Sequence, residues 1–338
     1  MVSLLVAKNE FLRSLKNKKK LVLTFLLPLI SIIMAIGINT MMKPSINLGV
    51  IDDQYINKSV EEKVSNIDRV KLSTANKSTI NTDIILAKYL GVVEFKKDNK
   101  FEVYCLDENM KIEIEEAISE VINSGSIDNV KGLLSILDEG SLSTSQRGNG
   151  FIFITLIITC TMSSSIMLKD KEDRVLLRYS TTPNKLSGYI LGNYIYNTIN
   201  TIIQILVSSV FIYLLKIDIG ISICKFIILG IIISIIAASI SILVTVISNS
   251  ELQASLLASS ISLIMALFGG TFLPIDKMPH MLKFISNISI TKWIIELTSS
   301  IQKGIVYGNN MIIITFIIVM SSFIVFVSAK IGEKKLKY

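Results

Sequence analysis

A charged strip from Lys169 to Pro183 carries the residues of this chain best suited to contact another protein. It lies between two apolar runs that are each long enough to cross a bilayer. Helix-forming residues up to Leu177 predict a short helix, and Pro183 stops it because proline cannot continue a helix. The strip predicts a docking helix, although a solvated loop that only sets topology has a similar composition. The predicted contact residues are Asp170, Glu172, Arg174, Leu177 and Arg178.

A second group of residues consists of amides and tyrosines at helical spacing in the apolar run that follows. Spacings of three and four place them near one face of a helix. Amides in hydrocarbon need partners, so such a face either holds helices together or lines a wet cavity. Interhelical contact is the commoner role, and a substrate pathway is the second hypothesis. The candidate pathway residues are Asn193, Asn197, Asn200 and Gln204, next to Tyr189 and Tyr196.

The elements that must position these residues are membrane spans. Hydrophobic residues make up 51% of the chain and charged residues 18%, which is too apolar for an ordinary soluble domain. Because lipid offers the backbone no hydrogen bonds, runs of this length are expected to be helices. The predicted spans are Leu21–Ile38, Gly150–Leu168, Ser187–Leu215, Ile221–Ser248, Leu252–Pro274 and Asn309–Lys330.

Basic residues predict the orientation. Six Lys or Arg residues lie in the first 20 positions against Glu10 alone, and the tail after the last span is also basic. The positive-inside rule therefore predicts a multi-pass protein of the cell membrane with both termini in the cytoplasm. Residues 1–20 also carry an apolar stripe that predicts an amphipathic interfacial helix. The basic residues flank spans and form no single stripe, so nucleic-acid binding is not expected.

Residues 43–148 differ abruptly in composition from the rest. They hold 13 Lys/Arg and 18 Asp/Glu and no run long enough to span. Given the orientation, this is an expected extracellular domain. Short β-rich runs alternating with helical patterns predict a small α/β layer. The predicted strands are Ile46–Ile51, Val70–Ser73, Leu90–Phe95 and Phe101–Leu106, the predicted helices are Tyr55–Asn66, Thr79–Lys88 and Glu108–Leu137, and Ser141–Gly150 is a predicted linker.

The segment 275–308 after the fifth span is the other long polar connector. Its apolar stripe and Trp293 predict one or two interfacial or partly re-entrant helices on the outer side. No charged residue lies deep in a predicted span, which disfavours an ion-coupled carrier. Neither the three cysteines nor the single histidine forms a metal-binding pattern.

Three stretches resemble one known family. Asp170-Lys-Glu-Asp-Arg-Val-Leu-Leu-Arg178, followed by Thr182-Pro183, resembles the coupling-helix segment of type-2 ABC exporter permeases. Phe268-Gly-Gly-Thr-Phe-Leu-Pro274 with Met278-Pro279 is similar to that family's element at the outer end of the fifth span, and Leu48–Asp53 to the first strand of its outer domain. The order of these motifs covers the whole chain. The outer gate residues implied are Gly269, Phe272, Pro274 and Pro279.

The resemblance implies an α-helical membrane protein with six transmembrane helices of the type-2 ABC exporter kind and a small α/β extracellular domain between the first two spans. Its expected parts are an interfacial helix (1–20), the first transmembrane helix (21–42), the extracellular domain (43–148) and the remaining spans (149–338). The last part contains the coupling helix (169–183) and the outer segment (275–308).

The resemblance also implies partners. The sequence contains no G-x-x-x-x-G-K-[ST] motif, so ATP and Mg²⁺ are expected on a separate cytoplasmic ABC ATPase subunit. A second permease, identical or related, and membrane lipid are the other expected partners. No cofactor, metal or catalytic residue is expected in this chain. The expected activity is outward transport of a lipophilic compound, an antimicrobial peptide or a similar substrate.

Two alternatives remain at this point. A membrane sensor or resistance component could bind a ligand through the outer domain. A two-span sensor needs a cytoplasmic signalling domain, whereas the longest predicted cytoplasmic segment here is the Lys169 strip. An ion-coupled secondary carrier is the less favoured alternative because of the missing buried charges.

Overall fold

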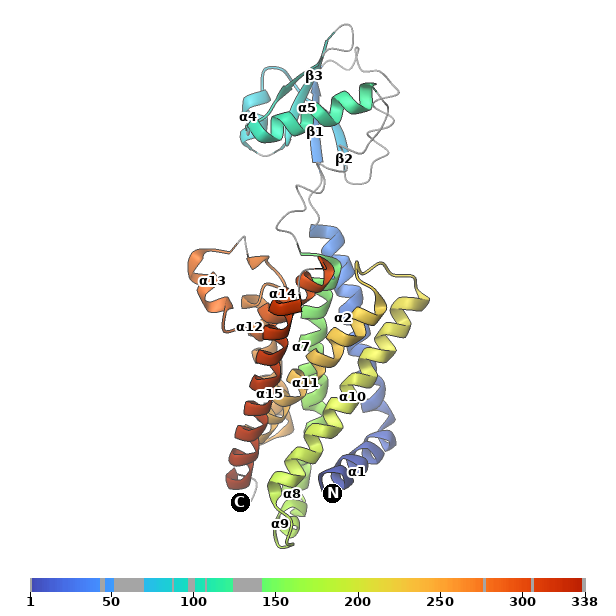
Figure 1. The fold of residues 1–338 in the computed structure, drawn as a ribbon, viewed down its shortest axis with the longest axis vertical. Coiled ribbons are helices and arrows are strands. Elements are labelled where there is room, and N and C mark those ends of the chain that lie inside the picture. Colours follow the sequence, from blue (N-terminus) through green and yellow to red (C-terminus); the bar gives the residue numbers. More distant parts are fainter. Residues whose placement is uncertain are drawn as a thin grey trace. The chain divides into compact units, whose positions relative to one another are not determined.

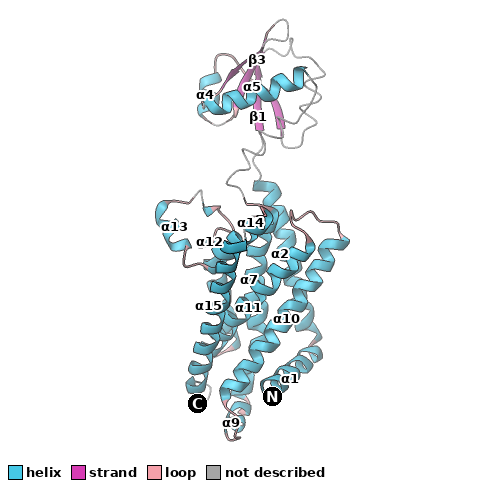
Figure 2. Cartoon of the chain, viewed as in Figure 1, coloured by secondary structure: helices cyan, strands magenta, loops and turns pink. Residues whose placement is uncertain are grey.

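The computed structural model describes residues 2–42, 46–51, 70–86, 88–96, 101–106, 108–123, 142–275, 278–304 and 307–335. The chain divides into two units, one formed by Met1–Met41 with Leu142–Tyr338 and the other by Met42–Ser141. The first unit is helical. Within the described residues, strands occur only in the second unit (Figure 2).

Six helical segments of the described chain are long and apolar enough to cross a membrane, in agreement with the six predicted spans. They involve α2, α7 with α8, α10, α11, α12 and α15 (Figure 1). The helices of this unit are α1 (Val2–Lys16), α2 (Lys18–Met42), α7 (Thr144–Ser164), α8 (Ile166–Glu172), α9 (Val175–Ser180), α10 (Leu186–Leu214), α11 (Ile223–Ile247), α12 (Glu251–Phe268), α13 (His280–Ser286), α14 (Ile290–Gln302) and α15 (Tyr307–Lys335).

Helices α7 and α11 form the centre of the bundle. In the most apolar 18-residue stretch of each segment, 72% of the residues are buried in α7 with α8 and 67% in α11, against 22% in α12. Helix α11 also packs closely on α10, where a Cβ on Gly230 would lie 2.4 Å from Ile205 Cγ2. The outer helices α2, α12 and α15 therefore present most of their apolar surface outward.

Helix α7 begins earlier than the sequence predicted. Ser143 caps it through a capping box, in which the Ser143 hydroxyl accepts from Gln146 N–H and the Gln146 side chain accepts from Ser143 N–H. The helix therefore starts at Thr144, inside the stretch predicted to be a linker and assigned to the outer domain up to residue 148. Both Gly148 and Gly150 lie within the helix, where Gly150 packs against Thr271.

Helix α1 packs along the first half of α10 at a glycine. A Cβ on Gly192 would lie 2.6 Å from Val6 Cβ and 2.7 Å from the Ser3 carbonyl oxygen. Several leucines of the predicted amphipathic stripe remain exposed on this unit, as expected for a helix that lies in a membrane interface. These exposed residues are Leu4, Leu5, Leu12 and Leu15.

Replacing Gly192 with alanine should destabilise the contact between α1 and α10. The new methyl group meets backbone as well as side-chain atoms, and overpacking of this kind costs about 1–3 kcal/mol, partly offset by about 1 kcal/mol of helix propensity. The melting temperature of the purified protein in detergent measures the effect. Gly188→Ala is the control on the same helix, because its nearest neighbour, Ser3 Oγ, is 3.8 Å away. Equal melting temperatures for the two variants would contradict the packing described here.

The second unit is an α/β layer. Its elements are β1 (Ile46–Ile51), β2 (Val70–Thr74), α4 (Ile80–Ile85), β3 (Gly91–Phe95), β4 (Phe101–Tyr104) and α5 (Glu108–Asn123). The sheet order is β2-β1-β3-β4, with β1 parallel to β2 and β3, and β4 antiparallel to β3. Neighbouring Val92 and Val93 belong to two different cores, one with α4 and one with α5, so both sheet faces are covered.

Most predicted elements of this unit agree with the structure within a few residues. The predicted helix Tyr55–Asn66 lies outside the described residues, and so does the predicted helix Glu108–Leu137 beyond Asn123. The described residues between 278 and 304 include two helices, α13 and α14. The buried face of α14 packs on α7, where Asn149 Nδ2 donates to Thr298 Oγ1 at 3.0 Å.

Candidate functional site

The charged strip forms a helical hairpin and not the single helix that the sequence predicted. Helix α8 follows α7 directly and ends at Glu172, and α9 starts at Val175. The chain turns at Arg174, whose φ of 57° lies in the left-handed region. This conformation is unfavourable for a residue with a Cβ, so the turn imposes local strain on the backbone at Arg174. The hairpin lies at the same end of the helical unit as both chain termini (Figure 1).

Helix α9 is anchored on one side and exposed on the other. Leu176 is 1% exposed and packs in a cluster with Tyr189 and Ile190 of α10 and Ile242 of α11. Leu177 is 50% exposed. The structure therefore brings four of the five predicted docking residues to the surface of the hairpin: Glu172, Arg174, Leu177 and Arg178.

Asp170, the fifth predicted docking residue, is buried. It is 2% exposed, and its carboxylate accepts two hydrogen bonds from the Arg13 guanidinium of α1, at 2.8 and 2.9 Å. Tyr189 OH of α10 donates to the same carboxylate at 2.6 Å. Arg13 also bonds Glu10 at 3.1 Å. We call Glu10, Arg13, Asp170 and Tyr189 the latch, because they join α1, α8 and α10.

The electrostatics of the latch depend on Arg13. Burial raises the pKa of Glu10, whose side chain is 1% exposed, while Arg13 lowers it and Asp170 raises it further. The hydrogen bond to Asp170 raises the pKa of Arg13, so the guanidinium stays charged. Two buried carboxylates thus share one cation that is 40% exposed. Removing that cation would leave both acids without a neutralising partner.

A second polar cluster joins α8 to two further helices, α2 and α12, near this end. Ser165 Oγ, between α7 and α8, donates to Glu251 Oε1 of α12 at 2.7 Å. Lys20 of α2 lies 3.6 Å and Lys169 of α8 lies 3.7 Å from Glu251. The hairpin is therefore tied to α1 and α10 through the latch and to α2 and α12 through Glu251. Sequence reasoning missed Glu10, Arg13 and Glu251, because their partners are far away in the sequence.

The amide face of α10 packs inside the helical unit. Asn193, Asn197 and Gln204 are at most 1% exposed and Asn200 is 6% exposed. Asn197 Nδ2 donates to Ser164 Oγ of α7, and Thr159 Oγ1 of α7 donates to Gln204 Oε1 at 3.1 Å. These contacts are interhelical. Among the described residues, Asn197 Oδ1 and Gln204 Nε2 have no partner, which leaves positions where water or a polar ligand could bind.

Replacing Asn197 and Gln204 together with leucine should lower the stability of the helical unit. Each lost interhelical bond costs roughly 0.6 kcal/mol in a membrane bundle. Melting temperature and transport are measured side by side, with exposed Asn249→Leu as the control. A drop in transport at unchanged stability would instead favour the pathway hypothesis for this face.

The predicted outer gate residues, called the outer motif from here on, follow the end of α12. Gly269 is the residue directly after α12. It packs so closely against α14 that a Cβ would lie 2.4 Å from Thr291 Cβ. Phe272 packs edge-on against Phe151 of α7, with ring centroids 5.3 Å apart. Pro274 and Pro279 flank the connection to α13. These contacts hold α12 against α7 and α14, and a gating role for them stays a prediction.

The sequence comparison agrees with this arrangement. A family model described as ABC-2 type transporter matches residues 118–303, which is more than half of the chain. The matched range includes α7 to α14 and with them the hairpin, the amide face and the outer motif. No curated protein matches the sequence. With six helices able to span a membrane, the chain is a multi-pass membrane transport component that belongs to the ABC-2 type transporter family.

Proposed function

We propose that this chain is the permease subunit of an ATP-driven exporter and that the α8–α9 hairpin is where the ATPase docks. The observation that carries the proposal is the surface of α9. Leu177 is half exposed and lies among charged residues at the end of the helical bundle. Its neighbour Leu176 is buried in the bundle and holds α9 in place. Protein interfaces commonly have an apolar centre with a polar rim, and α9 offers this arrangement with Leu177 at its centre.

The latch supports a mechanical role for the hairpin. A displacement of α8 acts directly on α1 through Arg13 and on α10 through Tyr189, because all three meet at the Asp170 carboxylate. Buried, well-packed contacts transmit such a displacement without absorbing it. In this proposal Asp170 positions the hairpin, and the exposed residues of α9 contact the ATPase.

The remaining parts follow from the same proposal. ATP and Mg²⁺ are bound by the ATPase subunit, and this chain supplies the membrane path. A second permease, identical or related, completes the path, and the exported substrate is a lipophilic compound, an antimicrobial peptide or a similar molecule. Both termini lie in the cytoplasm, and the α/β unit lies outside the cell.

Affinity purification of the tagged permease from its native membranes tests the proposal. It should recover a subunit that contains a P-loop, and inside-out vesicles holding both subunits should accumulate the substrate only with ATP. A permease that purifies without any nucleotide-binding subunit, and whose transport is indifferent to ATP, would overturn it.

Cysteine labelling of intact cells should report the proposed orientation. In a variant whose three natural cysteines are replaced by serine, Leu106→Cys in the α/β unit should react with an impermeant reagent. Thr181→Cys, just after α9, should react only after permeabilisation. Both positions are exposed, so the difference reports the side of the membrane and not burial. Labelling of Thr181→Cys in sealed cells would reverse the topology.

A further inference from the structure

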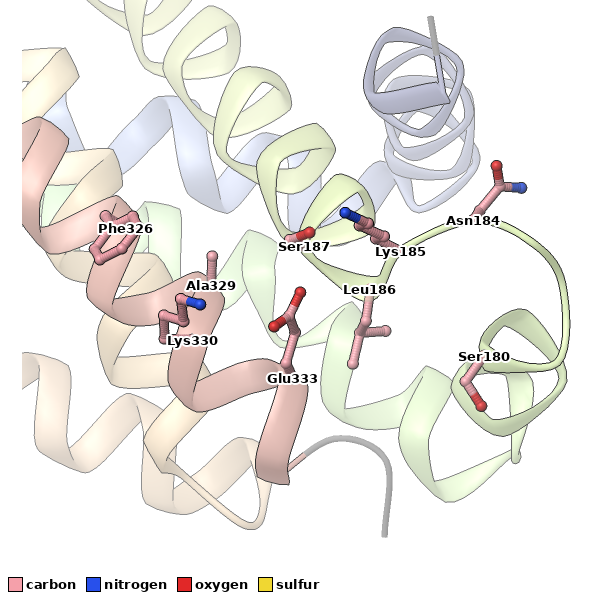
Figure 3. A pocket seen from close by; sticks show the side chains of 9 residues that line it. All are labelled: Ser180, Asn184, Lys185, Leu186, Ser187, Phe326, Ala329, Lys330 and Glu333. Carbon is pink, nitrogen blue, oxygen red and sulfur yellow. The ribbon is translucent and has the colours of Figure 1, made fainter.

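A cavity of about 590 Å³ opens between the start of α10 and the end of α15, next to the hairpin. Its size is that of pockets which hold small organic ligands. One wall comes from Lys185 and Ser187, and the other from Phe326, Ala329, Lys330 and Glu333 of α15. Figure 3 shows the charged side chains of the two walls flanking the same space.

The charges that line this cavity are not paired with one another. Within the described residues, Lys185 and Glu333 form no ion pair or side-chain hydrogen bond. The Lys330 ammonium lies 5.9 Å from the centre of the Phe326 ring and has no carboxylate partner there. Two cations and one anion are thus held in one cavity and are free to bind a ligand that carries the opposite charges.

The position of the cavity indicates that the ligand comes from the membrane. Leu186 is the first residue of one helix that is long and apolar enough to cross a membrane, and Lys335 is the last of another, so the cavity lies at the depth of the lipid headgroups. Phe326, which is 61% exposed, and Ala329 extend the α15 wall toward the hydrocarbon side. A basic cavity between helix ends, continuous with an apolar helix face, fits a lipid with a charged head and acyl chains.

We infer that this cavity binds the phosphoethanolamine headgroup of a membrane phospholipid. The phosphodiester lies between Lys185 and Lys330, with Ser187 as a hydrogen-bond donor, and the ammonium lies at Glu333. The carboxylate decides between headgroups: it attracts the primary ammonium of ethanolamine, and it disfavours a headgroup whose only charge is negative. If the proposed orientation is correct, this lipid belongs to the cytoplasmic leaflet.

Native mass spectrometry of the delipidated full-length protein, titrated with single phospholipids, tests this inference. Phosphatidylethanolamine should bind first, about fivefold more tightly than phosphatidylcholine, whose quaternary ammonium cannot donate to Glu333. Lys185→Gln/Lys330→Gln should weaken that binding by roughly 25-fold, taking a factor of about five for each lysine. Glu333→Gln should abolish the preference for ethanolamine over choline while binding of the phosphodiester persists.

A matched double variant controls for net charge. Lys216 and Lys303 are exposed near the other end of the helical unit, so Lys216→Gln/Lys303→Gln removes the same charge and should leave lipid binding unchanged.

Three results would overturn the inference. The first is that phosphatidylglycerol binds best and Glu333→Gln has no effect. The second is that soluble glycerophosphoethanolamine binds as tightly as the lipid. The third is loss of ATPase binding at unchanged lipid binding in the Lys185/Lys330 variant, which would assign the cavity to the ATPase.

Discussion

Replacing Arg13 with alanine should destabilise the helical unit by about 2–3 kcal/mol. Removing one partner of a buried ion pair typically costs 3–5 kcal/mol, and the value is reduced here because Arg13 is 40% exposed and water can reach the gap. The remaining carboxylates of Asp170 and Glu10 are 3% and 1% exposed in their side chains and would face each other without a cation. Chemical or thermal unfolding of the purified permease in detergent measures the loss.

Two further variants separate the latch from a general effect of charge. Lys16→Ala removes an exposed cation from the same helix and should change stability by less than about 0.5 kcal/mol. Adding Glu10→Gln to Arg13→Ala should restore part of the loss, because it removes one of the two buried like charges. If Arg13→Ala behaves like Lys16→Ala, or if Glu10→Gln worsens it, the latch does not hold α1 to the hairpin.

The double replacement Leu177→Asp/Arg178→Glu should abolish productive contact with the ATPase subunit. It places a charge in a proposed apolar contact and reverses a second charge at the surface of α9. Losses at a central contact residue commonly reach about 2 kcal/mol or more, which corresponds to at least about 30-fold in affinity. Both recovery of the ATPase and substrate-dependent ATP turnover should fall, while the melting temperature stays the same because neither side chain is buried.

Leu106→Asp is the matched control for this experiment. Leu106 is 70% exposed in the other unit, so the same chemical change there should leave ATPase recovery intact. Leu176→Asp is a contrasting variant: its side chain is 1% exposed, and it should fail by unfolding the cluster around Tyr189. Normal ATPase recovery and turnover in Leu177→Asp/Arg178→Glu would exclude the hairpin as the docking element.

Local patterns in the sequence predicted the elements of this fold well. The six apolar segments follow from length and composition, because a run that must hide its backbone in lipid has helix as its solution. The strands around Val92 and Val103 follow from β-branched residues bounded by polar turns. The start of α7 was predicted too late, because the capping box at Ser143 lies in a polar stretch that composition alone assigned to a linker.

The role of individual charged residues depended on the tertiary structure. By composition, Asp170 is one of several charges in a docking strip, and nothing nearby in the sequence distinguishes it from Glu172. Its partner Arg13 is 157 positions away, and only the packing of α1 against α10 brings the two together. The turn at Arg174 likewise divides the strip into two short helices, α8 and α9, which each carry one buried and one exposed predicted contact or anchor residue.

The sequence by itself thus determined that this is a helical membrane protein with a separate α/β segment and a charged strip suited to a partner, because span length, period and charge asymmetry are local properties. Only the tertiary structure decided which polar residues face a partner, which join helices and which line a cavity. Burial and pairing depend on contacts between segments far apart in the chain. The amides of α10 illustrate the difference: their spacing predicted one shared face, but the contact of that face with α7 is visible only in the folded chain.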